Sequence, residues 1–134
     1  MKKEDLIERS IEMRKKAYVP YSKFPVGAAV LTKSGKVYTG CNIENAAYPV
    51  SLCAERVAIF KAVSDGETEF VEMAVSADTK RPVSPCGSCR QVMSEFFQPE
   101  TTIHLTNLQN QLKTVTMEEL LPFSFQPDDL PPSL

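Results

Sequence analysis

The N-terminal part of the chain carries apolar residues at helical spacing, followed by two short runs of β-forming residues. One face of the first segment presents Leu6, Ile7, Ser10, Ile11 and Ala17. This spacing predicts a helix over 3–17, which Pro20 ends. The runs at 26–31 and 37–41 flank a Lys-Ser-Gly-Lys turn and therefore predict two antiparallel strands joined as a hairpin.

Apolar residues surround the whole circumference of the next predicted helix, which spans 51–64. A helix of this kind is buried on most of its sides, and Asp65-Gly66 supplies its end. Alternating residues over 70–77 predict a third strand. A loop then leads to a third helix over 86–97, which ends before Pro99.

The last part of the chain predicts two strands, a short helix and an extended tail. The strands span 102–108 and 112–115. Thr116 and Glu119 have the spacing of a capping box, in which each side chain bonds the other residue's backbone at the start of a helix. A proline ends this helix and begins the tail, which covers 122–134.

The predicted order αββαβαββα is typical of an α/β fold. We expect a three-layer αβα sandwich with a mixed sheet of about five strands and helices on both faces. The chain shows no repeat or linker, so we expect a single domain over 1–134, with 122–134 as its tail. A chain of this length buries roughly 68% of its unfolded surface, enough for one core.

Charge and composition narrow the class of partner and the compartment. The chain has 15 Lys+Arg against 17 Asp+Glu, a formal charge of -2, so we expect no nucleic-acid partner. No segment approaches the roughly 20 apolar residues that span a bilayer, so we expect no membrane partner. Met1 is followed by Lys-Lys-Glu-Asp rather than a signal core, which favours the cytoplasm. Cysteines there are usually reduced and serve metal binding, catalysis or packing.

Three of the four cysteines stand at the starts of the second and third predicted helices. Cys53 opens the second helix, while Cys86 and Cys89 open the third with two residues between them. The partial positive charge of helix N-termini favours thiolates there. Three protein ligands leave one tetrahedral position for water or substrate, as in catalytic zinc sites. Glu55 follows Cys53 by two residues and is placed to move protons.

Other interpretations of these cysteines stay open at this point. A lone C-x-x-C is also compatible with a redox pair or with two unrelated buried thiols. A structural zinc site would use Cys41 as a fourth ligand, which leaves Glu55 without a role; packing as a small buried residue suits Cys41 better. The single histidine, His104, lies in a predicted strand away from both clusters and is interpreted as structural.

These residues resemble the short-chain homotetrameric zinc-dependent cytidine deaminases of nucleoside salvage. Five separated blocks in the family's order carry the resemblance, at 21–29, 40–49, 53–56, 85–91 and 121–125. They include the runs Cys53-Ala54-Glu55-Arg56 and Pro85-Cys86-Gly87-Ser88-Cys89. The resemblance implies one Zn²⁺ per subunit on Cys53, Cys86 and Cys89, with Glu55 as the proton shuttle. It implies hydrolytic deamination of cytidine and deoxycytidine to uridine and deoxyuridine plus ammonia, in pyrimidine salvage.

The resemblance also assigns the substrate-binding residues. Asn42 and Glu44 match the family's ribose-binding pair, and Phe24 is expected to contact the base or the sugar. Backbone groups near Ala54 would complete base recognition. Phe125 matches the aromatic residue that reaches an adjacent subunit's active site and stacks on the base, so we expect a homotetramer. Because Glu44 repels phosphate, a free pyrimidine nucleoside is favoured over a nucleotide. A deaminase of a cytosine-containing nucleoside antibiotic has a similar motif set and stays an alternative.

Three thiolates leave a formal charge of -1 on a zinc site, which weakens the metal as a Lewis acid. Arg56 and Arg90 each lie close to a ligand cysteine in the sequence. We expect both guanidinium groups to donate to cysteine sulfurs and withdraw charge. The alternative is that both are ordinary helix residues with solvent or carboxylate partners.

Overall fold

The structure, a computed structural model, describes residues 1–132. Its strands are β1 Val26–Thr32, β2 Val37–Cys41, β3 Phe70–Ala77, β4 Thr102–Thr106 and β5 Leu112–Thr116. Its α-helices are α1 Lys3–Met13, α2 Ala54–Ser64, α3 Gly87–Phe96 and α4 Met117–Leu120. Short 3-10 turns lie at Arg14–Lys16, Tyr48–Val50 and Pro127–Asp129. The predicted order of helices and strands is confirmed.

The five strands form one mixed sheet in the order β2-β1-β3-β4-β5. Strand β1 pairs antiparallel with β2 and with β3, and β4 pairs antiparallel with β5. The β1–β2 hairpin turns at Gly35, whose φ of 95° favours glycine. Strands β3 and β4 are parallel, so α3 serves as the crossover between them.

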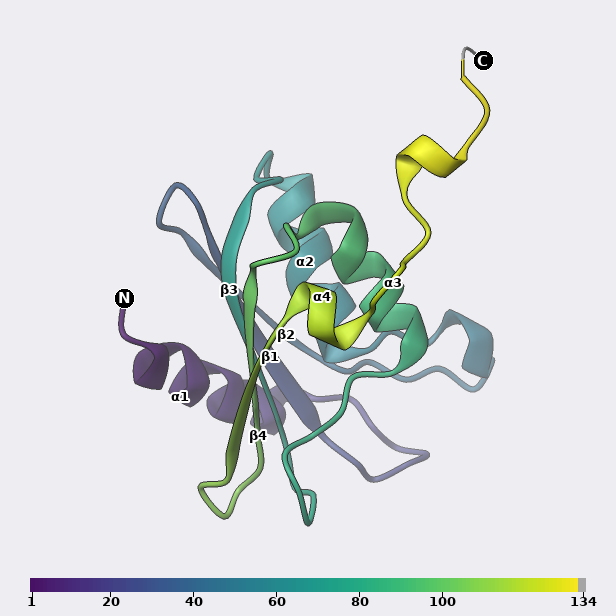
Figure 1. Cartoon of the computed structure of the whole chain (residues 1–134). Coiled ribbons are helices and arrows are strands. Elements are labelled where there is room, and N and C mark those ends of the chain that lie inside the picture. The colour runs from purple at the N-terminus through teal and green to yellow at the C-terminus, as the bar shows by residue number, and fades with distance from the viewer. Residues whose placement is uncertain (133–134) are drawn as a thin grey trace.

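Alternating side chains of the sheet meet helices on opposite faces. Met73 and Val75 belong with Ile103 to a large core under α2, α3 and α4. Ala29 and Ala74 belong to a smaller core with Leu6 of α1. Figure 1 shows α1 on one side of the sheet and the other three helices opposite it. The predicted three-layer αβα sandwich with five strands is therefore confirmed.

Several predicted boundaries shift by a few residues. The first helix changes to a 3-10 turn after Met13 instead of continuing to residue 17. The second helix begins at Ala54 rather than Ser51, because Cys53 has extended backbone angles, φ -76° and ψ 155°. Cys86 is likewise extended, and α3 begins after it. Both cysteines are thus N-cap residues.

The C-terminal segment contains the predicted capping box and a largely extended tail. Thr116 accepts from the Glu119 backbone N–H, and Glu119 accepts from the Thr116 backbone, so the capping box is confirmed. Beyond α4 the tail turns at Pro122 and Phe123 and again at Pro127–Asp129, and it is otherwise largely extended. It projects from the body in Figure 1. Residues 133–134 of the predicted tail lie outside the described part of the chain.

Gly40 of β2 lets this strand pack directly against the start of α2. A Cβ atom at Gly40 would lie 2.5 Å from the carbonyl oxygen of Ala54 and 2.6 Å from the backbone nitrogen of Ala58. The close approach brings the end of β2 and the first turn of α2 together. Within residues 1–132, every helix is too short or too polar to cross a bilayer.

Candidate metal centre

Three cysteine sulfurs converge between the starts of α2 and α3. The Sγ atoms of Cys53 and Cys86 lie 3.9 Å apart, and those of Cys86 and Cys89 lie 3.5 Å apart. All three lie within 4.8 Å of one another and could hold a metal ion. Zn–S bonds of about 2.3 Å at tetrahedral angles separate sulfurs by about 3.8 Å, so the spacing fits zinc.

Cys41 and His104 stay outside this cluster. Within the described residues, the group of potential metal ligands contains the other three cysteines but not Cys41, which is buried on β2. This placement does not support a four-cysteine structural site. His104 is buried in β4, where its ring bonds the Thr114 hydroxyl and the Glu72 carboxylate. It is a satisfied structural histidine, as interpreted from the sequence.

The surroundings shift the pKa values of Cys53 and Cys89 in opposite directions. A hydrogen bond with Cys89 lowers the pKa of Cys53 to about 5, and Arg56 adds to the effect by hydrogen bonding and charge. The Nη2 of Arg56 lies 3.3 Å from the Sγ of Cys53. The pKa of Cys89 is raised, first by its bond to Cys53 and then by burial. The surroundings therefore favour the thiolate form of Cys53 over that of Cys89.

Glu55 lies in the first turn of α2, beside the cluster. Its side chain is buried, with 4% of the residue exposed. Burial is the main cause that raises its pKa to about 7, and the charge of Cys53 raises it further. A carboxyl group in this range gains and loses protons near neutral pH.

A cavity of about 300 Å³ opens next to the cluster. The predicted site residues that line it are Phe24, Asn42, Glu44, Cys53, Ala54, Glu55 and Cys86. Residues from the loop before β1, the segment after β2 and the two helix starts therefore meet in one pocket. This volume lies at the small end of the range for ligand sites, which suits a compact ligand.

Asn42 and Glu44 also line this pocket and hold the neighbouring backbone in place. Asn42 accepts from the Val26 N–H at 2.9 Å and donates to the Phe24 carbonyl at 2.8 Å, which fixes the loop that carries Phe24. Glu44 Oε1 accepts from the backbone N–H groups of Tyr21 and Ser22 at 3.0 and 3.1 Å. Hydrogen bonds from Ser22 lower the pKa of Glu44 and keep it ionised as an acceptor.

Comparison with known proteins agrees with this geometry. The family model described as the cytidine and deoxycytidylate deaminase zinc-binding region matches residues 1–105. The chain belongs to this zinc-binding deaminase family. The matched segment contains all three clustered cysteines, consistent with Zn²⁺ as the cofactor.

Close relatives cover almost the whole chain. A cytidine deaminase of Sporosarcina psychrophila is 55% identical over 95% of this chain and 93% of that protein. One of Halalkalibacterium halodurans is 52% identical over 97% of this chain and 98% of that protein. The crystal structure of cytidine deaminase from Burkholderia pseudomallei superposes with a TM-score of 0.91 at 46% identity, covering 93% of this chain and 100% of that one.

The pocket also includes residues that the sequence did not predict. Val83 and Ser84 line it from the loop before α3, and Ser22 lines it beside Phe24. Val83 is 8% exposed and gives the pocket an apolar wall. An apolar residue placed just before Pro85-Cys86 was the available signal, because that loop has to reach the same pocket as Cys86.

Arg56 and Arg90, the two arginines near the clustered cysteines, have different hydrogen-bond partners. Arg56 donates to Cys53, whereas Arg90 donates to the carbonyls of Pro85 and Leu120 and to the hydroxyl of Ser84. The expectation that Arg90 bonds a sulfur does not match these contacts, since no sulfur is among its partners within the described residues. Arg90 instead joins the ligand loop to the end of α4.

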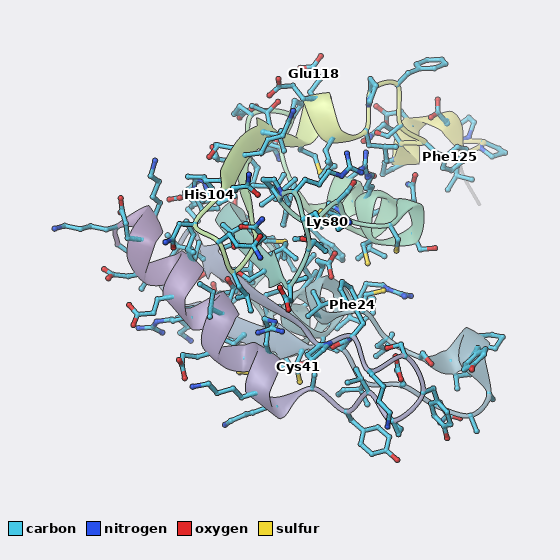
Figure 2. The ribbon with its side chains drawn as sticks, turned by 90° about the horizontal axis from the view of Figure 1, so that it is seen from below. Phe24, Cys41, Lys80, His104, Glu118 and Phe125 are labelled. Carbon is cyan, nitrogen blue, oxygen red and sulfur yellow. The ribbon has the colours of Figure 1, made fainter. Side chains whose placement is uncertain are left out.

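Phe125 lies apart from the pocket of its own chain. It is 57% exposed and is not among the described residues that line the cavity. Figure 2 shows Phe125 on the tail, well apart from Phe24. Its backbone carbonyl accepts from Gln91 Nε2 of α3 at 3.0 Å. The ring is therefore available for a contact outside its own pocket.

Proposed function

We propose that this protein is a zinc-dependent cytidine deaminase. It hydrolyses the free nucleosides cytidine and deoxycytidine to uridine and deoxyuridine with release of ammonia, in pyrimidine salvage. One observation carries the proposal: three sulfurs at zinc-compatible spacing and the buried carboxyl group of Glu55 adjoin a single small pocket. Relatives that are more than half identical and bear the name cytidine deaminase support it.

Cys53, Cys86 and Cys89 would hold one Zn²⁺ per subunit. The bound ion supplies Lewis-acid activation of water at neutral pH. Glu55 takes a proton from the water that adds to C4 of the cytosine ring and delivers it to N3. It then passes the second proton to the amino group, which leaves C4 as ammonia. Its burial excludes competing solvent from this path.

The pocket walls match the two halves of a nucleoside. Phe24 and Val83 offer apolar surface to the flat base, and backbone groups near Ala54 offer hydrogen bonds to its edge. Asn42 and Glu44 lie where ribose hydroxyl groups need acceptors. The ionised Glu44 repels a phosphate on the sugar, which favours the free nucleoside over a nucleotide.

Self-association as a homotetramer completes the proposed site. Phe125 of one subunit stacks on the base in the pocket of an adjacent subunit. Its exposure and its position apart from Phe24 in Figure 2 support this assignment, because the ring is free to contact a neighbouring subunit. All four cysteines are free thiols, which is consistent with the reducing cytoplasm.

Arg56 offsets part of the negative charge that three thiolates bring to the zinc. Its hydrogen bond to Cys53 supports this role. For Arg90 the contacts support a different role, in which it holds the ligand loop against the end of α4.

The decisive experiment follows ammonia release from cytidine and deoxycytidine with purified protein, before and after zinc is removed by a chelator. We expect turnover that is lost on chelation and restored by Zn²⁺. Glu55→Ala should keep stoichiometric zinc and the fold but lose turnover by about two to four orders of magnitude. Cys41→Ala is the matched cysteine control and should keep both zinc and turnover. Near-normal activity of Glu55→Ala, or loss of zinc in Cys41→Ala, would contradict the proposal.

A further inference from the structure

Two consecutive side chains of α3 hold the C-terminal segment at two points. Arg90 Nη1 donates to the carbonyl of Leu120 at 2.8 Å, and Gln91 Nε2 donates to the carbonyl of Phe125 at 3.0 Å. Because Cys89 immediately precedes these residues and Cys86 is the N-cap of the same helix, α3 is linked both to the cysteine cluster and to both ends of the segment 120–125.

The chain between the two anchors bends through an unfavourable backbone conformation. Phe123 has φ of 51°, in the left-handed region that bulky residues rarely adopt. Its side chain is fully exposed, so packing of the ring does not impose the bend. Such a conformation persists only where the surrounding structure determines it. The two anchored carbonyls, those of Leu120 and Phe125, lie on either side of this bend in the chain.

The tail around Gln126 is held by hydrogen bonds between its own residues. The backbone N–H of Gln126 donates to Asp129 Oδ2 at 2.8 Å, and the Gln126 side chain bonds the Ser124 hydroxyl. The turn at Pro127–Asp129 follows. These bonds stay within the tail, so they shape it but do not orient it against the body.

We propose that Gln91 is a positioning residue that sets the direction in which Phe125 is presented, with Arg90 anchoring the base of the tail. The inference rests on the role proposed above for Phe125. Gln91 holds the carbonyl of Phe125 and leaves its ring free for the neighbouring subunit. Gln91 is exposed, and among the described residues it belongs neither to the cysteine cluster nor to the lining of the pocket.

Three variants of the zinc-loaded full-length protein test the hydrogen bond that the Gln91 side chain donates to the Phe125 carbonyl. Gln91→Glu keeps the shape of the side chain and removes the N–H, while Gln91→Lys keeps a donor. Gln98→Glu, just beyond α3, is the matched control for the added charge. We expect Gln91→Glu to raise KM about three- to tenfold, the range that a single neutral hydrogen bond supplies, with kcat nearly unchanged. Gln91→Lys and Gln98→Glu should stay close to wild type.

A second readout follows the tail directly, by amide hydrogen exchange over 121–130. Exchange should be faster in Gln91→Glu than in Gln98→Glu, at equal zinc content. Wild-type KM and wild-type exchange in Gln91→Glu would overturn the inference. Phe125→Ala separates this failure from that of the proposed function. If Phe125→Ala leaves KM unchanged, the stacking role fails, and the exchange result alone decides whether Gln91 orients the tail.

Discussion

The guanidinium group of Arg56 in α2 donates through Nη2 to the Sγ of Cys53, the N-cap residue of the same helix, at 3.3 Å. The Nε of Arg56 is buried and has no hydrogen-bond partner within the described residues. A buried N–H without an acceptor is costly, so this atom would gain from a further acceptor of negative charge nearby. Arg56 thus bonds the cysteine cluster through Nη2, and its Nε–H is still able to donate a further hydrogen bond.

Replacing Arg56 should weaken the metal site. Arg56→Gln removes the positive charge and most of the donor set while keeping a polar side chain of moderate length. Loss of a partner that bonds a metal ligand commonly costs about 10- to 100-fold in metal affinity, and we expect an effect of this size. Competition with a zinc-binding dye measures it. Arg9→Gln, the same charge change on the exposed surface of α1, is the control, and equal affinities of the two variants would refute the role of Arg56.

Gly40→Ala should destabilise the protein and disturb the contact between β2 and α2. The added Cβ would lie 2.5 Å from the Ala54 carbonyl oxygen, so one of the two elements has to move. Overpacking of this kind costs about 1–3 kcal/mol of unfolding free energy. Denaturant unfolding of the zinc-stripped protein measures the loss. Gly87→Ala is the control, because apart from its chain neighbours and its own helix backbone no described atom lies within 4 Å of the Cβ position at Gly87.

Hydrophobic periodicity predicted the order of elements and the layers, because each face of this sheet has its own helix or helices to pack against. It missed the start of α2, since the three residues from Ser51 to Cys53 are compatible with a helix by composition. Their extended course is set by the long-range bonds of Leu52 with Ile43. A propensity pattern contains no information about that pairing.

The site residues show the same limit. Arg56 lies three residues after Cys53 and Arg90 lies directly after Cys89, so closeness to a ligand cysteine predicted the same role for both. The structure separates them because Leu120, 30 residues after Arg90, supplies a carbonyl that accepts from it at 2.8 Å. The three cysteines were predictable because their motifs place them close to the starts of two helices, even though the exact first residue of each helix was not predicted.

Acid should remove the stabilisation that Glu119 provides at the start of α4. Hydrogen bonds from Thr116, first from its backbone N–H, hold the pKa of Glu119 below its ordinary value. A lowered folded-state pKa means that the carboxylate stabilises the fold above its unfolded pKa of about 4.3 and loses this effect as pH falls through the folded value. Glu119→Ala should therefore be less stable than Glu118→Ala at neutral pH, and the gap should narrow in acid. Denaturant midpoints at both pH values measure it, and a gap that does not change with pH would contradict the assignment.

Phe125→Ala should raise KM for cytidine, because stacking of a base on an aromatic ring is worth about 1–3 kcal/mol. An effect of this size corresponds to roughly a five- to 150-fold change in KM. The sharper test mixes two variants, since the proposed ring comes from a neighbouring subunit. Glu55→Ala lacks the proton shuttle but has an intact tail, and Phe125→Ala has the reverse.

Assemblies reconstituted from both variants should contain pockets with an intact Glu55 and a neighbour's Phe125. A fraction of the activity should therefore regain the wild-type KM, while Phe125→Ala alone keeps the raised value. Saturation curves of the mixture resolve the two components, and sedimentation confirms mixed tetramers. If the tail served its own subunit, the mixture would show only the raised KM, because every subunit with a working Glu55 would lack its ring.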